Sequence, residues 1–595
     1  MQKPMKEFAA FAAAFAACAL FALDMPFSTC GSYFAVSPHE KDDWFEQHEA
    51  GVWIRTVSNA GSSGFIARII PVKDGKELAV SGFGESPELL TLKTGEGDIE
   101  VAFADPETIL LRSESVGIRL DFSRDARWRF MWEVPSRAGR KAALATLFDN
   151  RVKLLADARR GGHRVECPWD GFAASNSVFE AWSEGDGVEI ALRECVYDWD
   201  GRLPETGFDD AVAAQRASFG RFLKTVPSLP AEFEQARVKA ARLMWSSVVE
   251  PRGNLRRRAM LMSKNWMTHI WSWDHCFNAM ALAGGDMNAA WDQFMCVFDL
   301  QAPNGQLPDA MDAYGSVYSF VKPPVHGWAL RRMMATGEIS AGRLEEAYGK
   351  LSKWTDYWFK CRDRDGNGLC EYDHGNDSGW DNSTAFLGTL PVETPELAAY
   401  LSIQMDVLAE IAARLGRNGE AKAWREKAAA TVARAVKELF DAEGRPAVRK
   451  VLSGEKSYPL TMLTRLSLLL GDALPAKARE RMLKEVASDT FLTEWGLATE
   501  SPRSGYYTDD GYWRGPIWAP ETMIAIDALK VCGRNDLARE VALRFCRMCA
   551  KGGFAENFDA KTGAPLRDKA YTWTASAFLV IGHELGTLPD TKSKK

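Results

Sequence analysis

The stretch "ELAAYLSIQMDVLAEIAARL", residues 396–415, decides the fold of the larger part of the chain. Its apolar side chains fall on one face of an α-helix, at Leu397, Tyr400, Leu401, Met405, Leu408, Ile411 and Leu415. Segments with the same period follow one another after Pro230. They predict about twelve helices, near residues 231–249, 272–284, 287–301, 324–336, 342–361, 393–415, 418–440, 459–470, 475–487, 519–532, 536–549 and 569–586.

The loops between these helices are of two kinds. Long loops rich in Trp, Gly and Asp alternate with short polar ones such as "GRNGE", residues 416–420. Six helical hairpins with functional residues in one set of loops predict a closed toroid, an all-α (α/α)6 barrel over residues 231–595. An open helical solenoid would give similar counts, although the sequence shows no repeat of fixed period.

The part of the chain before the helices has the pattern of β-structure. "GIRLDF" (117–122) and "DIEVAFA" (98–104) alternate apolar and polar residues, and turn signals such as "KDG" (73–75) separate such runs. Many short strands predict an all-β antiparallel sandwich over residues 24–208. Residues 209–226 then have a helical pattern and "PSLP" (227–230) closes it, so residues 209–230 form a predicted helical linker.

The length and net charge of the chain limit the number of hydrophobic cores and the kinds of partner to expect. A chain of 595 residues is too long for one hydrophobic core. Its formal charge of −7 and pI near 5.8 give no basic face, so no nucleic-acid partner is expected. The 21 tryptophans stand out, because tryptophan can cover a sugar ring as well as fill a core. The sequence leaves the oligomeric state open.

The N-terminal segment, residues 1–23, has two interpretations. Lys3 and Lys6 precede an uncharged run, "FAAFAAAFAACALFAL", which is typical of a secretory signal, and Cys18 suggests a lipoprotein cleavage site. The run is too short for a comfortable membrane span, so no integral membrane domain is predicted. Glu7 argues against a signal and favours a buried N-terminal helix. The location is therefore either exported, as in the periplasm, or cytoplasmic.

Eleven cysteines are scattered along the chain. Only Cys546 and Cys549 form a C-x-x-C pair, inside a helical stretch with no second pair, which argues against a zinc site there. We expect buried, free thiols.

Four loop segments combine aromatic rings with carboxylates. "HGNDSGWDNST" (374–384) has the glycines and Asn/Asp residues of a turn rather than a helix or strand. The others are "WMTHIWSWDHCFNAMA" (266–281), "YYTDDGYWRGPIWAPE" (506–521) and "GGFAENFDAKTGAP" (552–565). Rings that stack on sugar faces, beside charged groups that bind hydroxyls, fit a neutral carbohydrate. No phosphate loop, H-E-x-x-H motif or G-x-S-x-G elbow competes with this interpretation.

Glycosidic cleavage requires two carboxyl groups, which inverting enzymes hold about 6.5–9.5 Å apart. Asp381 and Glu556, on separate loops at the same barrel end, could meet this requirement. Trp380 would partly desolvate Asp381, raise its pKa and keep it protonated.

The helical part resembles the glycoside hydrolase clan of family 63, which includes processing and bacterial α-glucosidases and mannosylglycerate hydrolase-like proteins, and family 37, the trehalases. The matching segments over roughly residues 260–585, in the family's order, are "WSWDHCF", "NGQLPDA", "PPVHGW", "NDSGWDNS", "GYWRGPIW" and "ENFDAKTG". "DMPFSTCGSYFAVS" (24–37) also resembles the start of the β-sandwich that precedes the barrel in bacterial members.

The resemblance implies a role for each matched residue. The general acid falls on Asp381 and the general base on Glu556. Asp274 would hold hydroxyls in the first sugar subsite. The other residues of the implied pocket are Trp273, Trp380, Trp513, Arg514 and Trp518, with His326 at its edge. Trp573 is either a sugar platform or core packing. Asp377 could be a second acid of the site, but capping or bracing of its loop is the favoured role.

The expected activity is that of an inverting, exo-acting α-glycosidase, acting on an α-glucosyl residue of an oligosaccharide or small glucoside without a required cofactor. A trehalase or mannosylglycerate-type hydrolase could use the same acid and base. A phosphorylase would leave Glu556 without a role. A non-catalytic carbohydrate-binding barrel is the alternative of another class. Binding alone would not require the second carboxylate, which argues against it.

"DRDGNG", residues 363–368, has the spacing of a calcium loop. Asp363, Asp365 and Asn367 occupy its first, third and fifth positions, but His374 stands where an EF-hand has its bidentate Glu. A structural calcium ion and a plain turn are both consistent with this pattern.

Overall fold

The computed structural model describes residues 23, 25–39, 50–58, 64–123, 128–388 and 390–586. The predicted N-terminal segment therefore lies, apart from Leu23, outside the described residues. The chain divides into two compact units. The first runs up to Phe222 and includes Trp245–Glu250, and the second comprises Leu223–Met244 and the chain from Pro251 onward.

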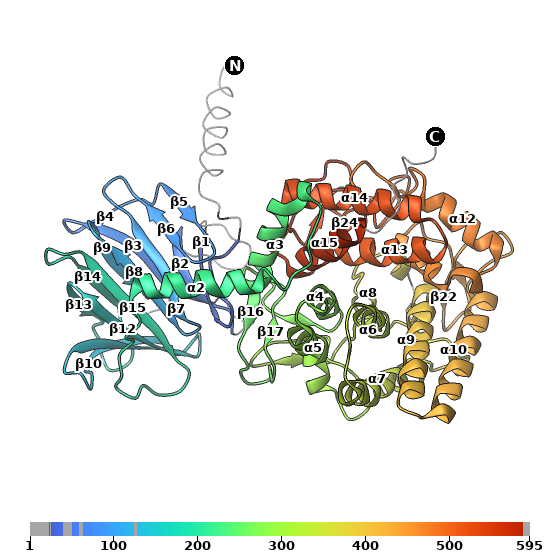
Figure 1. The fold of residues 1–595 in the computed structure, drawn as a ribbon, viewed down its shortest axis with the longest axis horizontal. Coiled ribbons are helices and arrows are strands. Elements are labelled where there is room, and N and C mark those ends of the chain that lie inside the picture. The colour runs from blue at the N-terminus through green and yellow to red at the C-terminus, as the bar shows by residue number, and fades with distance from the viewer. Residues whose placement is uncertain are drawn as a thin grey trace, which may run out of the picture. The chain divides into compact units, whose positions relative to one another are not determined.

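The first unit is an antiparallel β-structure of two sheets (Figure 1). Its strands are β1 Phe34–His39, β2 Gly51–Thr56, β3 Phe65–Lys73, β4 Lys76–Glu77, β5 Gly82–Glu85, β6 Leu90–Lys93, β7 Ile99–Asp105, β8 Thr108–Ser113, β9 Gly117–Asp121, β10 Arg129–Pro135, β11 Lys141–Leu147, β12 Val152–Arg160, β13 Gly162–Glu166, β14 Val178–Trp182 and β15 Val188–Cys195. One sheet has the order β1-β2-β3-β9-β14-β13, with β4 paired to β3, and the other has the order β10-β11-β12-β15-β8-β7-β6-β5.

The alternation seen in the sequence places one face of each strand in the core between the sheets. Ile118 and Leu120 of β9 and Val101 and Phe103 of β7 belong to the same buried cluster, although their strands lie in different sheets. The helix α2, Phe208–Phe222, packs on β7 through Phe208 and Ala211. The segment predicted as a linker is thus divided, because its helix belongs to the β unit and the chain from Leu223 belongs to the helical unit.

The second unit is helical. Its helices are α3 Glu234–Ser247, α4 Asp274–Leu282, α5 Met287–Met295, α6 His326–Thr336, α7 Ala341–Cys361, α8 Gly375–Ser378, α9 Pro395–Arg414, α10 Asn418–Glu438, α11 Met462–Arg465, α12 Ala476–Val486, α13 Ala519–Val531, α14 Asn535–Gly552 and α15 Thr572–Leu585. The 3-10 helices are η2 Ala231–Phe233, η3 Cys296–Leu300, η4 Thr384–Phe386 and η5 Leu466–Ala473.

Short strands occupy the loops: β16 Val248–Val249, β17 Ala259–Met260, β18 Ile270–Trp271, β19 Ala310–Met311, β20 Ser316–Val317, β21 Val392–Glu393, β22 Val448–Lys450, β23 Lys456–Ser457, β24 Ile517–Trp518, β25 Asn557–Phe558 and β26 Pro565–Leu566. Several of them pair across loops that are distant in sequence, for example β18 with β19 and β24 with β25.

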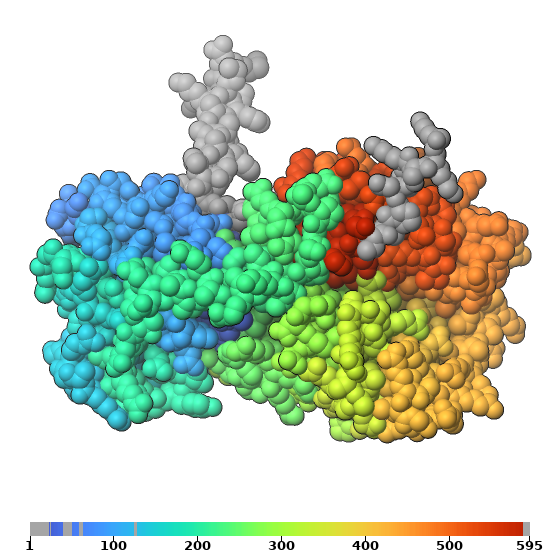
Figure 2. Space-filling model, viewed as in Figure 1, coloured from blue at the N-terminus to red at the C-terminus, as the bar shows by residue number. Residues whose placement is uncertain are grey.

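The inner helices form a closed ring. Contacts run from α4 to α6, α9, η5, α13 and α15, and α15 contacts α4 again (Figure 1). Outside this ring, α5 packs on α4, α10 on α9, α12 on η5, and α14 on α13 and α15. In the space-filling view, packed side chains fill the spaces between these ribbons (Figure 2). The closed ring confirms the predicted (α/α)6 barrel and excludes the open solenoid.

None of the ten described cysteines forms a disulfide bond. Five of them are buried, Cys276, Cys296, Cys370, Cys546 and Cys549, and the other five are partly exposed, so the prediction of buried thiols is correct for half of them. None of the described helices is long and apolar enough to cross a membrane.

Candidate active site

The aromatic segments meet at one end of the barrel. The inner helices alternate with outer helices that return the chain, so the inner helices run in the same direction and their first residues gather at one end. Asp274 begins α4, and Trp573 lies in the first turn of α15. Trp518 directly precedes α13. The loop carrying Asp381 leads toward α9.

Five tryptophans of these loops form one buried cluster. Trp513 and Trp518 stack with centroids 3.9 Å apart, and Trp380 lies 4.7 Å from Trp513. Trp573 is 5.5 Å from Trp518 and 5.4 Å from Trp273. The structure thus brings together the four tryptophans that the sequence placed in the pocket and Trp573, which the sequence assigned either to a sugar platform or to core packing.

The loop that carries Asp381 contains a short helix, which the sequence did not predict. Residues Gly375–Ser378 form the single turn α8, in which His374 accepts from the Asn376 backbone N–H and Asp377 accepts from the His374 backbone N–H. Gly379 ends this turn with φ of 74°. A Cβ atom at Gly379 would lie 2.5 Å from the Trp273 ring, so only glycine allows this close approach.

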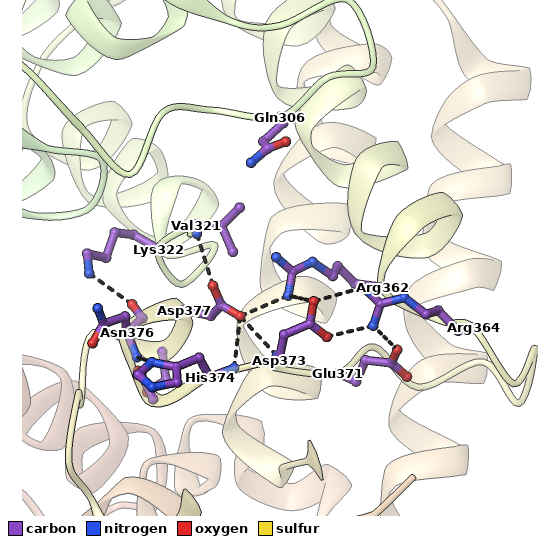
Figure 3. A network of polar contacts seen from close by, with 12 residues as sticks. Gln306, Val321, Lys322, Arg362, Arg364, Glu371, Asp373, His374, Asn376 and Asp377 are labelled. Atoms are coloured by element: carbon purple, nitrogen blue, oxygen red, sulfur yellow. Dashed lines mark hydrogen bonds and ion pairs between the residues drawn. The ribbon is translucent and has the colours of Figure 1, made fainter. Parts of the chain in front are cut away.

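Asp377 braces the loop from inside (Figure 3). Its side chain is fully buried and accepts hydrogen bonds from the Val321 backbone N–H at 3.0 Å and from Arg362 at 2.8 Å. The backbone N–H groups of Asp373 and His374 donate to the same carboxylate. Asp377 is therefore committed to loop structure, as the sequence predicted.

Asp381 lies two residues beyond this turn in a partly buried position. Burial raises the pKa of its carboxyl group, the Lys322 ammonium lowers that pKa, and Asp309 raises it again. Lys322 is buried, lies 3.0 Å from Asp309 and donates to the Asn376 carbonyl (Figure 3). The raised pKa favours the protonated form of Asp381, the form that a general acid requires.

Glu556 reaches the same region through strand pairing. Asn557 of β25 pairs with Trp518 of β24, which places Glu556 beside the tryptophan cluster. The Glu556 side chain is buried, and this burial raises the pKa of its carboxyl group to about 8, with a further upward contribution from Asp568. Arg567 and Tyr512 both lower the pKa of Glu556.

Tyr512 links the three carboxyl groups of the site. Tyr512 lowers the pKa of the Glu556 carboxyl group, and the charges of Glu556, Asp381 and Asp274 all help to raise the pKa of the Tyr512 phenol, after burial as the main cause. The Asp381 loop is tied to the Tyr512 loop through Asn382, whose side chain donates to the Gly511 carbonyl and accepts from the Trp513 N–H. Asp381 and Glu556 therefore both lie near one phenol.

Asp274 is buried at the start of α4. Tyr571 donates to one carboxylate oxygen at 3.4 Å, and the other oxygen, Oδ2, has no hydrogen-bond partner among the described residues. Burial raises the pKa of Asp274 well above its ordinary value, Lys322 opposes this rise, and Glu556 adds to it. The indole N–H of Trp573 is also buried without a partner in the described chain.

Two residues of the predicted pocket, His326 and Arg514, do not lie where the sequence predicted. His326 is fully buried at the start of α6, with its ring 5.2 Å from His275 of α4 and 5.3 Å from Phe298 of η3, and so packs among these elements rather than at the edge of the tryptophan cluster. Arg514 is partly exposed, and its Nε–H donates to the Asn382 carbonyl at 2.6 Å. This contact makes Arg514 a tie between two site loops.

The suspected calcium loop is held by its own contacts. The Gly368 backbone N–H donates to Asp363, and the Asn367 amide donates to Asp365 and to Glu393. The Arg449 guanidinium lies 3.5 Å from Asp365. Donors thus already occupy these side chains, and calcium binding at Asp363, Asp365 and Asn367 stays a prediction.

Lys322, Tyr512 and Tyr571 also belong to the site, although they were not among the residues predicted from the sequence. Tyr512 stands in the quoted "GYWRGPIW" segment, and Lys322 directly precedes "PPVHGW". The signal that the sequence offered was the position of Tyr512 inside one motif and of Lys322 beside another. Their function depends on contacts between loops, which sequence spacing does not give.

Comparison with known proteins identifies the family. Residues 267–574 match the model of the mannosylglycerate hydrolase MGH1-like glycoside hydrolase domain. The chain belongs to this MGH1-like family of glycoside hydrolases. The match contains Asp274, Asp381 and Glu556, as well as the five clustered tryptophans. The protein is thus a family 63-like glycoside hydrolase whose catalytic domain is the helical barrel.

The relatives of this hydrolase include enzymes for two sugars. Mannosylglycerate hydrolase of Rubrobacter radiotolerans is 25% identical over 401 residues, covering 53% of this chain and 90% of that protein. Glucosylglycerate hydrolase of Mycolicibacterium hassiacum is 24% identical over 409 residues, covering 52% of this chain and 91% of that protein.

Solved structures show the same fold. The family 63 mannosylglycerate hydrolase of Thermus thermophilus, in complex with Tris, aligns with a TM-score of 0.52 at 20% identity, over 58% of this chain and 99% of its own. A bacterial glucoamylase complexed with acarbose aligns with a TM-score of 0.60 at 11% identity over 95% of this chain and 94% of its own. The second alignment extends the likeness of fold to the β unit.

Proposed function

We propose that this glycoside hydrolase is an inverting, exo-acting α-glycosidase in which Asp381 is the general acid and Glu556 the general base. The observation that carries the proposal is the Tyr512 phenol, which lies near both carboxyl groups although these stand on separate loops. A binding site alone does not require two such groups, whereas glycosidic cleavage by inversion does.

Each group has a defined task in the proposed reaction. Asp381 donates its proton to the glycosidic oxygen as the bond to the anomeric carbon breaks. Glu556 accepts a proton from the water that attacks this carbon from the opposite face, so the configuration inverts. Tyr512 lowers the pKa of Glu556 and so favours the ionised form that a general base requires.

The buried polar groups of the site favour a sugar as the occupant. Asp274 Oδ2 and the Trp573 indole N–H, both without partners in the described chain, offer one acceptor and one donor to ring hydroxyls. The clustered tryptophans supply apolar walls for a sugar face. Asp274 and Trp573 are almost fully buried. A buried subsite suits one terminal sugar of a substrate rather than an internal sugar of a longer chain, so exo action is expected.

The sugar is proposed as α-linked glucose, released from an oligosaccharide or a small glucoside. A second candidate, supported by the family match and by the two relatives, is an α-hexosyl-glycerate such as mannosylglycerate or glucosylglycerate. A trehalose substrate would use the same acid and base.

A substrate screen with site variants tests this function. Purified protein is incubated with α-glucosides, α-mannosides, trehalose and both hexosylglycerates, and sugar release is measured. Asp381→Asn and Glu556→Gln should each lose about a hundred- to ten-thousand-fold in turnover while keeping sugar binding. Asp509→Asn, a surface carboxylate of the same loop region paired with Lys561, should retain activity. Full activity in either site variant would overturn the assignment.

A further inference from the structure

A second cluster of side chains, two imidazoles and a thiol, lies at the starts of α4 and α6 and is separate from the proposed acid and base. His275 and Cys276 lie in the first turn of α4, and His326 is the first residue of α6. All three are buried, and one ligand-type atom from each lies within 4.8 Å of the other two. The tryptophan cluster does not include them, and no step of the proposed hydrolysis uses them.

The hydrogen bonds of the cluster leave metal-binding atoms available. His275 Nδ1 lies 3.1 Å from the Trp271 carbonyl, a contact that places the ring proton on Nδ1 and leaves Nε2 with a lone pair. Cys276 Sγ lies 3.7 Å from His275 Nε2. The Ser272 backbone lies beside the His326 ring, yet neither ring nitrogen of His326 has a hydrogen bond of acceptable geometry among the described residues.

An imidazole that is fully buried with both nitrogens unpaired is costly, because buried polar groups are nearly always satisfied. Two imidazoles and a thiol are the ligands that zinc and similar ions prefer, and they are poor ligands for calcium or magnesium. Zinc bonds of about 2.0–2.3 Å in tetrahedral geometry place neighbouring ligand atoms about 3.4–3.6 Å apart. The sulfur–nitrogen distance of 3.7 Å is close to this spacing.

We propose that His275, Cys276 and His326 form a structural zinc site that fastens α4 to α6. Binding would release the thiol proton of Cys276 to solvent and form a thiolate–zinc bond, with the two neutral imidazoles as further ligands. The site does not depend on the proposed hydrolytic function.

Cobalt titration of the whole chain tests this site. Protein prepared without a metal-affinity tag is stripped with a chelator and titrated with Co²⁺, which reports thiolate ligation through its charge-transfer absorption. We expect about one Co²⁺ per chain, displaced by Zn²⁺. Cys276→Ser should abolish the thiolate band. Cys549→Ser, which alters another buried free thiol, should keep it.

Two outcomes overturn the proposal: wild-type protein without a thiolate band, or a band that persists in Cys276→Ser. If Cys276→Ser fails to fold, X-ray absorption at the cobalt edge of the wild-type protein decides the question. A coordination shell with sulfur and imidazole nitrogen supports the site, and an all-oxygen shell contradicts it.

Discussion

Glu556 combines a buried carboxyl group with the proposed task of a base. Its pKa of about 8 means that the unliganded enzyme holds the group protonated at neutral pH. A general base must be ionised, so one limb of the pH profile of kcat/KM is expected near pH 8, where Glu556 titrates. As the general acid, Asp381 must be protonated. Burial raises the pKa of its carboxyl group and so favours the protonated form.

Arg567 affects the limb of the pH profile that reports Glu556. Its positive charge favours ionised Glu556 and so lowers the pKa of that carboxyl group. Arg567→Gln removes the charge, the Glu556 pKa rises, and the limb of kcat/KM near pH 8 should move to higher pH by about half a unit to one unit. Asp510→Asn, which removes the partner of Arg567 at 2.7 Å and keeps the guanidinium, is the matched control. An unchanged or downward-shifted limb in Arg567→Gln would contradict the account.

The acid role of Asp381 predicts a dependence on the leaving group. A glycosyl fluoride needs little protonation to depart, whereas a sugar or glycerate hydroxyl needs a proton. Asp381→Asn should therefore lose much more activity on the natural type of glycoside than on the α-glycosyl fluoride, by about a hundred-fold or more. Initial rates of both substrates measure this ratio. Equal losses on the two substrates would assign Asp381 to binding or structure.

The loop around α8 shows how much sequence could predict about single elements. The twelve periodic helices were predictable because each carries its own apolar stripe, as α9 does. The four-residue α8 was missed because Asp377 holds its loop through contacts with Val321 and Arg362, which come from other parts of the chain. The order of the strands in the two sheets likewise depends on long-range pairing that alternation does not encode.

Gly379 gives a prediction at this scale. Gly379→Ala forces a side chain into a left-handed backbone conformation and against the Trp273 ring, at an expected cost of about 2–4 kcal/mol. Gly342→Ala, in α7 with open space around it, should stabilise the protein by about 0.5–1 kcal/mol. Chemical denaturation of the two variants checks the contrast. Similar stability changes in both would show that the Gly379 loop is not constrained.

At the scale of the whole molecule, the candidate site was predictable only in part. The motifs gave the candidate acid, the candidate base and four of the five clustered tryptophans, because these stand in recognisable segments. His326 was misplaced at the pocket edge, because helical spacing does not show that α6 points this ring at His275. Lys322 and Tyr512 enter the site through contacts between loops, which only the folded chain defines.

The two units have separate internal contacts and should unfold in separate steps. Differential scanning calorimetry is expected to show a calorimetric enthalpy larger than the van't Hoff enthalpy. The product monosaccharide at high concentration should raise the midpoint temperature of only one of the two transitions, that of the helical unit. Asp274→Asn should abolish this shift. A single two-state transition, or a shift of both transitions, would contradict this division.

The configuration of the first product tests the central claim most directly. Proton NMR follows the anomeric signals during the first minutes of hydrolysis of an α-linked substrate by the wild-type enzyme. Asp381 and Glu556, acting as acid and base on opposite faces, predict that the β-anomer appears first and only later equilibrates with the α-anomer. Initial release of the α-anomer would contradict the account, because retention requires a carboxylate nucleophile in place of an activated water.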